Sequence, residues 1–120
     1  MKILHIAEPH DGGVICYLTM LLPLLEQTGV QQYFICSKEC DKEKFERIVD
    51  GVEQIDLRRS LSPIYLIRII FKIRRLIRNF SPNILYCHSS FAGVFGRMAA
   101  IGLKCKVVYN PHGWAFNISK

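Results

Sequence analysis

The stretch KILHIAEPHDGGVICYLTMLLPLLEQTG, residues 2–29, contains the pattern that decides the fold. It begins with a short apolar run, residues 2–7, of the kind that forms a buried strand. A polar turn with two adjacent glycines follows, and a long apolar segment then runs from about residue 14 to residue 28, where Gly29 is expected to end a helix. The segment therefore predicts a strand–turn–helix unit.

The same alternation continues to the end of the chain, which predicts an α/β domain with a parallel sheet covered by helices on both faces. Numbered along the chain, about five strands are expected in the order 3-2-1-4-5, forming a Rossmann-like three-layer domain over residues 1–120. The last helix is rich in small residues and should pack closely on the sheet. The further predicted strands are 31–37, 52–57, 83–88 and 106–110, and the further predicted helices are 41–49, 62–80 and 92–102.

The composition is that of a globular protein, with 50% hydrophobic and 22% charged residues. Its five cysteines are an odd number and lie mostly in apolar runs, which favours reduced thiols in a cytosolic protein. Cys36 and Cys40 are too loosely spaced, and too far from a histidine pair, to predict a zinc site. The longest apolar run, residues 14–25, is shorter than the roughly 20 residues of a membrane-spanning helix.

Charge is distributed very unevenly along the chain. All ten acidic residues lie at or before Asp56, together with five basic ones, so this part has a net charge of −5. From Leu57 onward there are eleven basic residues and no acidic one, a net charge of +11. This asymmetry favours an anionic partner, which could be nucleic acid, anionic lipid or a phosphorylated substrate.

Three polar segments are expected at the carboxyl ends of strands, where α/β folds bind ligands. They are EPHDGG (8–13), CHSSFAG (87–93) and NPHGW (110–114). Gly12 and Gly13 would let the backbone approach an anion at the start of a helix, although a tight turn alone also needs glycine. The third glycine of a dinucleotide fingerprint is missing, and no G-K-[ST] of a P-loop follows.

The histidines divide into a core residue and candidate site residues. His5 lies inside the first strand and is expected to be packed in the core. His88, at the end of the fourth strand, is equally well explained by a hydrogen-bonded structural role or by a role facing a ligand. His112, beside Gly113 and one strand further, is the stronger site candidate, and His10 in the first loop could face the same cleft. We find no nucleophilic triad and no pair of catalytic carboxylates among these loops.

The predicted helix 62–80 has two unlike faces and an unexpected apolar stripe. Ser62 is a plausible N-cap and Pro63 fits the first helical position. At 100° per residue, Ile64, Ile67 and Phe71 fall among basic residues and should be exposed. Such a surface suits the headgroup region of an anionic membrane; burial by another domain and binding to nucleic acid are the alternatives. The core face comprises Leu66, Ile69, Ile70, Ile73, Leu76, Ile77 and Phe80, and the basic face Arg68, Lys72, Arg74, Arg75 and Arg78.

Four segments occur in a specific order and spacing that covers nearly the whole chain: HDGGVICYLTMLLPLLEQTG (10–29), RSLSP (59–63), LIRNFSPNILYCHSSFAGVFGRMAA (76–100) and VVYNPHGWAF (107–116). Together they resemble the amino-terminal, acceptor-side domain of GT-B glycosyltransferases of the family 4 type. The resemblance is strongest to bacterial enzymes that build capsular and other surface polysaccharides.

The resemblance implies an enzyme that transfers a sugar from a nucleotide-sugar with retention of configuration, without a metal or other cofactor. It implies that the acceptor is a lipid-linked glycan at the cytoplasmic face of the membrane. By the same resemblance, His112 lines the catalytic centre, Gly12 and Gly13 approach the donor diphosphate and the acceptor, and His88 and Gly113 belong to the substrate site.

The donor-binding glutamates and the basic pair that grips the diphosphate do not occur in this sequence. We therefore expect the donor-binding domain to be missing from this chain, through truncation or division of the enzyme between two chains, and the chain alone to be inactive. The alternative is a non-catalytic Rossmann-like module that docks a partner protein or nucleic acid through its basic helix.

Overall fold

The computed structural model describes residues 1–8, 13–57, 62–88 and 90–109, and these form one parallel sheet with helices on both faces. The strands lie in the order β3-β2-β1-β4-β5, which confirms the predicted Rossmann-like topology. The elements are β1 (Lys2–Ala7), α1 (Gly13–Glu26), β2 (Gln31–Ser37), α2 (Lys42–Glu46), β3 (Gly51–Ile55), α3 (Pro63–Phe80), β4 (Ile84–Cys87), α4 (Ser90–Ala99) and β5 (Lys106–Tyr109).

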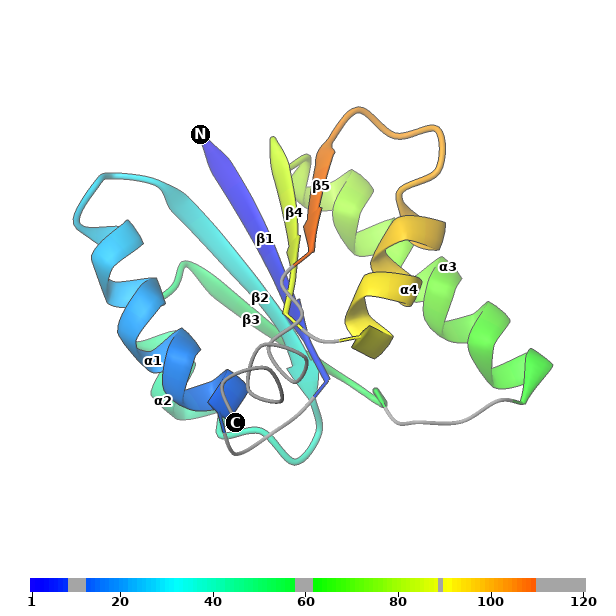
Figure 1. Cartoon of the computed structure of the whole chain (residues 1–120), viewed down its shortest axis with the longest axis horizontal. Helices are drawn as coiled ribbons and strands as arrows, with labels where there is room; N and C mark the ends of the chain where they lie inside the picture. The colour runs from blue at the N-terminus through cyan, green and yellow to red at the C-terminus, as the bar shows by residue number, and fades with distance from the viewer. Residues whose placement is uncertain (9–12, 58–61, 89, 110–120) are drawn as a thin grey trace, which may run out of the picture.

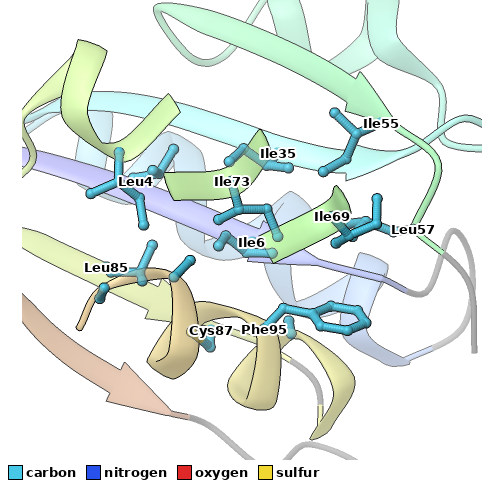
Figure 2. Packing of buried hydrophobic residues seen from close by; sticks show 14 residues of the cluster. Leu4, Ile6, Ile35, Ile55, Leu57, Ile69, Ile73, Leu85, Cys87 and Phe95 are labelled. Carbon is cyan, nitrogen blue, oxygen red and sulfur yellow. The ribbon is translucent and has the colours of Figure 1, made fainter. Parts of the chain in front are cut away.

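The two faces of the sheet have separate cores because successive strand residues point to opposite faces. Helices α3 and α4 cover one face and α1 and α2 the other (Figure 1). Figure 2 shows the first core, where Leu4 and Ile6 of β1 pack against Ile69 and Ile73 of α3 and Phe95 of α4. The second core contains Leu18, Leu22, Phe34 and Phe45, among others.

Helix α3 confirms the predicted division of its faces. Ile69, Ile73 and Ile77 are buried, and the other predicted core residues pack partly buried against them. Pro63 is at the start of the helix as expected, and Ser62 occupies the N-cap position. Its hydroxyl does not make the capping bond, however, whereas its carbonyl oxygen accepts a hydrogen bond from the Leu66 amide.

Several elements are shorter than the sequence predicts, among them α2 and β3. Helix α2 ends at Glu46 instead of residue 49, because Ile48 and Val49 both donate to the carbonyl of Phe45 in a closing turn. Strand β3 starts at Gly51 and ends at Ile55, since a turn from the Leu57 amide to the Ile55 carbonyl interrupts the ladder. Among the described residues, no helix combines the length and apolar character needed to cross a bilayer.

Helix α4 lies close to the sheet because two of its glycines, Gly93 and Gly96, face strands β5 and β4. A Cβ at Gly93 would lie 2.8 Å from the ring of Tyr109, and one at Gly96 would lie 2.5 Å from Cys87 Sγ. At either position a larger residue would therefore force the neighbouring side chain or the helix to shift. The close packing expected from the small residues of this segment is therefore present.

Candidate functional site

The carboxyl ends of β1, β4 and β5 lie at one edge of the sheet. Ile6 is paired with Cys87, and Cys87 with Tyr109, so the residues that follow these strands start from neighbouring positions. His88 follows β4 at this edge, and Gly13 is the first residue of α1, the helix that comes after β1 in the chain. Gly12, His112 and Gly113, like His10, lie outside the described residues, so their predicted roles stay predictions.

His88 is completely buried directly after β4. Its backbone amide donates to the carbonyl of Ile6 at 2.9 Å, which extends the pairing of β4 with β1 by one residue. Its imidazole stacks on the ring of Tyr86, with centroids 4.1 Å apart and planes 11° apart. These contacts give His88 the structural role that the sequence left open; its contact with a ligand stays a prediction.

His5 is also completely buried, as predicted for a core residue, but it is not merely packed there. Its Nδ1 lies 2.9 Å from Nε2 of His88, and its Nε2 lies 2.9 Å from Oε1 of Gln32. Burial lowers the pKa of His5 from 6.5 to about 4, although the hydrogen bond to Gln32 acts in the opposite direction. His5 is therefore a neutral imidazole at neutral pH, held between two polar side chains.

Gln32 on β2 anchors this arrangement. Its side chain is fully buried, and its Nε2 donates to the carbonyl of Leu22 in α1 at 2.9 Å. Its backbone amide donates to the carboxylate of Asp50 at 2.7 Å. Sequence reasoning missed Gln32 because no motif marks it and because it is one of two adjacent glutamines at the start of β2.

The α3 surface carries the predicted apolar stripe. Ile64, Ile67 and Phe71 are 66%, 55% and 65% exposed. Arg68, Lys72, Arg75 and Arg78 are exposed around them. The contact of this surface with a membrane stays a prediction, but the residues described here leave the stripe uncovered.

Arg74 differs from the other cations of this helix, because its guanidinium is bonded to α4; its contact with a membrane stays a prediction. It is only partly exposed, and its Nη1 donates to the carbonyl of Ala99 at 3.1 Å and to the carbonyl of Ile101. The guanidinium thus satisfies carbonyls at the carboxyl end of α4, where the helix dipole also favours a positive charge. Arg74 therefore holds α3 and α4 together.

An apolar groove of about 260 Å³ lies between α3 and α4, beside the exposed stripe. Val94 and Met98, 56% and 48% exposed, add α4 residues to the apolar surface. The sequence did not reveal this contribution because α3 and α4 meet only in the tertiary structure. The groove is lined by Pro63, Leu66, Ile67, Ile70, Val94, Phe95 and Met98.

All five cysteines have free thiols. The hydrogen bond with Cys40, together with burial, raises the pKa of the Cys36 thiol well above its ordinary value. Within the described parts of the chain, no three histidine, cysteine or acidic side chains are grouped so that they could hold a metal ion. Cys36, Cys40, Cys87 and Cys105 pack in the two cores, whereas Cys16 is exposed on α1.

The sequence model of Glycosyltransferase Family 4 matches residues 11–119, nearly the whole chain. The chain belongs to glycosyltransferase family 4. None of the curated proteins compared with the chain matches it. The family match confirms the resemblance and shows a glycosyltransferase domain.

Solved structures confirm the fold of this glycosyltransferase family 4 domain. The lipopolysaccharide outer core galactosyltransferase WaaB is 20% identical over 93% of the chain, with a TM-score of 0.75. MurG of Acinetobacter baumannii is 16% identical over 90% of the chain, with a TM-score of 0.73. A UDP-GlcNAc 2-epimerase of Methanocaldococcus jannaschii, 18% identical over 91%, has a TM-score of 0.72. An epimerase and two transferases thus share the fold, so the family assignment rests on the sequence model.

The chain spans about a third of the length of these structures: 33% of WaaB, 34% of MurG and 31% of the epimerase. The similarity lies in a Rossmann-like domain of the kind found in the GT-B architecture, which the resemblance implied.

Proposed function

We propose that this domain is the acceptor-side half of a retaining glycosyltransferase that moves a sugar from a nucleotide-sugar to a lipid-linked glycan. The observation that carries the proposal is the family 4 match over residues 11–119 on a sheet whose β1, β4 and β5 end at one edge. In this proposal His112 lines the catalytic centre, Gly12 and Gly13 approach the phosphates, and His88 and Gly113 contribute to the substrate site.

The donor-binding half of the site is proposed to lie outside this chain. The chain covers only about a third of the solved relatives, and its sequence contains neither the donor-binding glutamates nor the basic pair expected of the other half. The domain alone would therefore hold an acceptor without transferring sugar to it. No cofactor or metal is assigned to the reaction, so a chelator should leave the rate of transfer unchanged.

Sugar transfer from labelled nucleotide-sugars to lipid-linked glycans tests the proposal. We expect no transfer by the chain alone, and transfer when it is combined with a donor-binding domain of the same family. In the active combination, His112→Ala should abolish transfer, whereas Lys44→Ala on the exposed side of α2 should not. The product should keep the anomeric configuration of the donor. Transfer by the chain alone, or inversion of the anomeric carbon, would contradict the proposal.

The second part of the proposal places the α3 surface against the cytoplasmic face of the membrane. Exposed Ile67 and Phe71 would enter the headgroup region while the neighbouring cations meet anionic lipid, and the groove between α3 and α4 widens the apolar area. An acceptor with a lipid anchor would then be presented at the same surface on which the domain rests.

Sedimentation with lipid vesicles separates this role from the alternative of a binding module. We expect binding to vesicles that contain anionic lipid, weakening as salt is raised, and little binding to neutral vesicles. Equal binding to both kinds of vesicle would contradict the electrostatic part. Salt-dependent binding to duplex nucleic acid in place of vesicles would favour the module that docks nucleic acid.

A further inference from the structure

A continuous chain of hydrogen bonds crosses three strands beneath α1, from Gln32 on β2 through His5 on β1 to His88 after β4. We propose that Gln32 and His5 are positioning residues that fix the tautomer of His88, with the proton on Nε2 and the lone pair on Nδ1. The inference concerns the protonation of His88 and does not rest on the proposed function.

The orientation of the Gln32 amide is the starting point. A backbone carbonyl can only accept a hydrogen bond, so the atom of Gln32 that lies 2.9 Å from the Leu22 carbonyl must be the amide nitrogen. The amide oxygen then faces His5, and because that oxygen is an acceptor, Nε2 of His5 must carry a proton. The carbonyl in α1 thereby determines which nitrogen of a ring on β1 is protonated.

The protonation of His5 transmits this constraint to the other side of its ring. A neutral imidazole has one donor and one acceptor nitrogen, so with Nε2 as donor the Nδ1 atom holds a lone pair. Complete burial between uncharged Gln32 and His88, and the lowered pKa, favour the neutral ring. Nδ1 of His5 must therefore accept a hydrogen bond.

His88 supplies the donor for that bond. Its Nε2 lies 2.9 Å from Nδ1 of His5, and the stacking on Tyr86 holds the plane of the ring. With the proton on Nε2, neutral His88 keeps its lone pair on Nδ1. Any group that bonds to Nδ1 must then be a hydrogen-bond donor, such as a hydroxyl, whereas a bare phosphate oxygen cannot bond there.

Long-range nitrogen–proton spectra of the isotope-labelled protein report the tautomer of each histidine directly. A His10→Gln/His112→Gln background leaves only the two buried rings to assign. At neutral pH we expect both rings as the Nε2–H tautomer. In Gln32→Leu we expect His88 to shift to a mixture of tautomers, because His5 is then free to place its proton on either nitrogen.

Gln54→Leu is the matched control, since this glutamine on β3 bonds its amide to the carbonyls of Lys38 and Cys40, away from the histidines. We expect unchanged tautomers there. An Nδ1–H tautomer of His88 in the unsubstituted protein would overturn the proposal. So would an unchanged His88 tautomer in a folded Gln32→Leu protein.

A second measurement keeps the proposal testable if Gln32→Leu fails to fold. In the unsubstituted protein, a scalar coupling through the hydrogen bond should link Nε2 of His88 to Nδ1 of His5, with the proton bonded to His88. A proton bonded to Nδ1 of His5 would overturn the proposal. Both spectra are recorded without substrate, so their outcome is independent of whether the sugar-transfer assay succeeds.

Discussion

Gly96 of α4 lies directly over Cys87 of β4, so close that an added Cβ would be 2.5 Å from the Cys87 sulfur. The same added Cβ would lie only 3.2 Å from Cδ2 of Leu85. Cys87 and Leu85 both belong to the buried core on this face of β4. The distance between helix and sheet at this end of the site is therefore set by the absence of a side chain.

Gly96→Ala should destabilise the domain by about 1–2 kcal/mol, the cost of overpacking reduced by the better helix propensity of alanine. Urea denaturation measures the change. In a Cys87→Ala background the same substitution should cost at least about 1 kcal/mol less, because the contacting sulfur is gone. Equal costs in both backgrounds would show that the contact with Cys87 is not the cause.

His5 should make stability depend on pH. Its pKa is about 4 in the folded protein and 6.5 when unperturbed, so the unfolded chain binds more protons between these values. The contribution of neutral His5 to the free energy of unfolding is complete above pH 6.5. About 3 kcal/mol of it is lost as the pH falls from 6.5 to about 4. The difference in unfolding free energy between the protein and His5→Gln should shrink accordingly across this range. A constant difference would contradict the lowered pKa.

Arg74 and Arg75 should differ sharply although they are neighbours in α3. Arg74→Met removes the hydrogen bonds to the carbonyls of Ala99 and Ile101 and should destabilise the domain by about 1–2 kcal/mol. Arg75→Met changes an exposed side chain and should stay within about 0.5 kcal/mol. Thermal or urea unfolding of the two variants makes the comparison, and equal effects would refute the role given to Arg74.

Each basic residue on the exposed α3 surface should contribute separately to the affinity for anionic lipid. Arg75→Gln and Arg78→Gln should each weaken binding to anionic vesicles by about 1 kcal/mol, roughly fivefold. Ile67→Asp should weaken it further by removing apolar contact and adding repulsion. Lys44→Gln on α2, which covers the other face of the sheet, is the control and should bind normally. If Lys44→Gln weakens binding as much as Arg75→Gln, the surface of α3 is not specifically involved.

The local sequence pattern predicted the strands and helices well because hydrophobic residues recur at the spacing typical of each kind of element. The strand at Gln31–Ser37 and the two faces of α3 could be assigned from alternation and from the spacing of isoleucines. The ends of α2 and β3 were wrong because short turns, closed at Phe45 and Ile55, compete with the repeating hydrogen bonds. Such competition depends on a single bond and leaves little trace in composition.

The candidate site was only partly predictable. The sequence itself indicated that His88 follows a strand and lies next to other loops that are expected to bind a ligand, but not which nitrogen of its ring would be protonated. That depends on Gln32 and on the Leu22 carbonyl, whose neighbourhood follows from the packing of α1 on the sheet. Similarly, Arg74 and Arg75 have the same chemistry, and only the position of α4 separates a structural cation from a free one.

By itself, the sequence determined the order of elements, the parallel sheet and the membership of the glycosyltransferase family, because periodicity and motif spacing are properties of neighbouring residues. The tertiary structure alone decided that His5 and His88, separated by 83 positions, share a hydrogen bond, and that α3 and α4 enclose an apolar groove. Parallel strands pair through long crossovers, so contacts across the sheet depend on register and packing, which no local pattern contains.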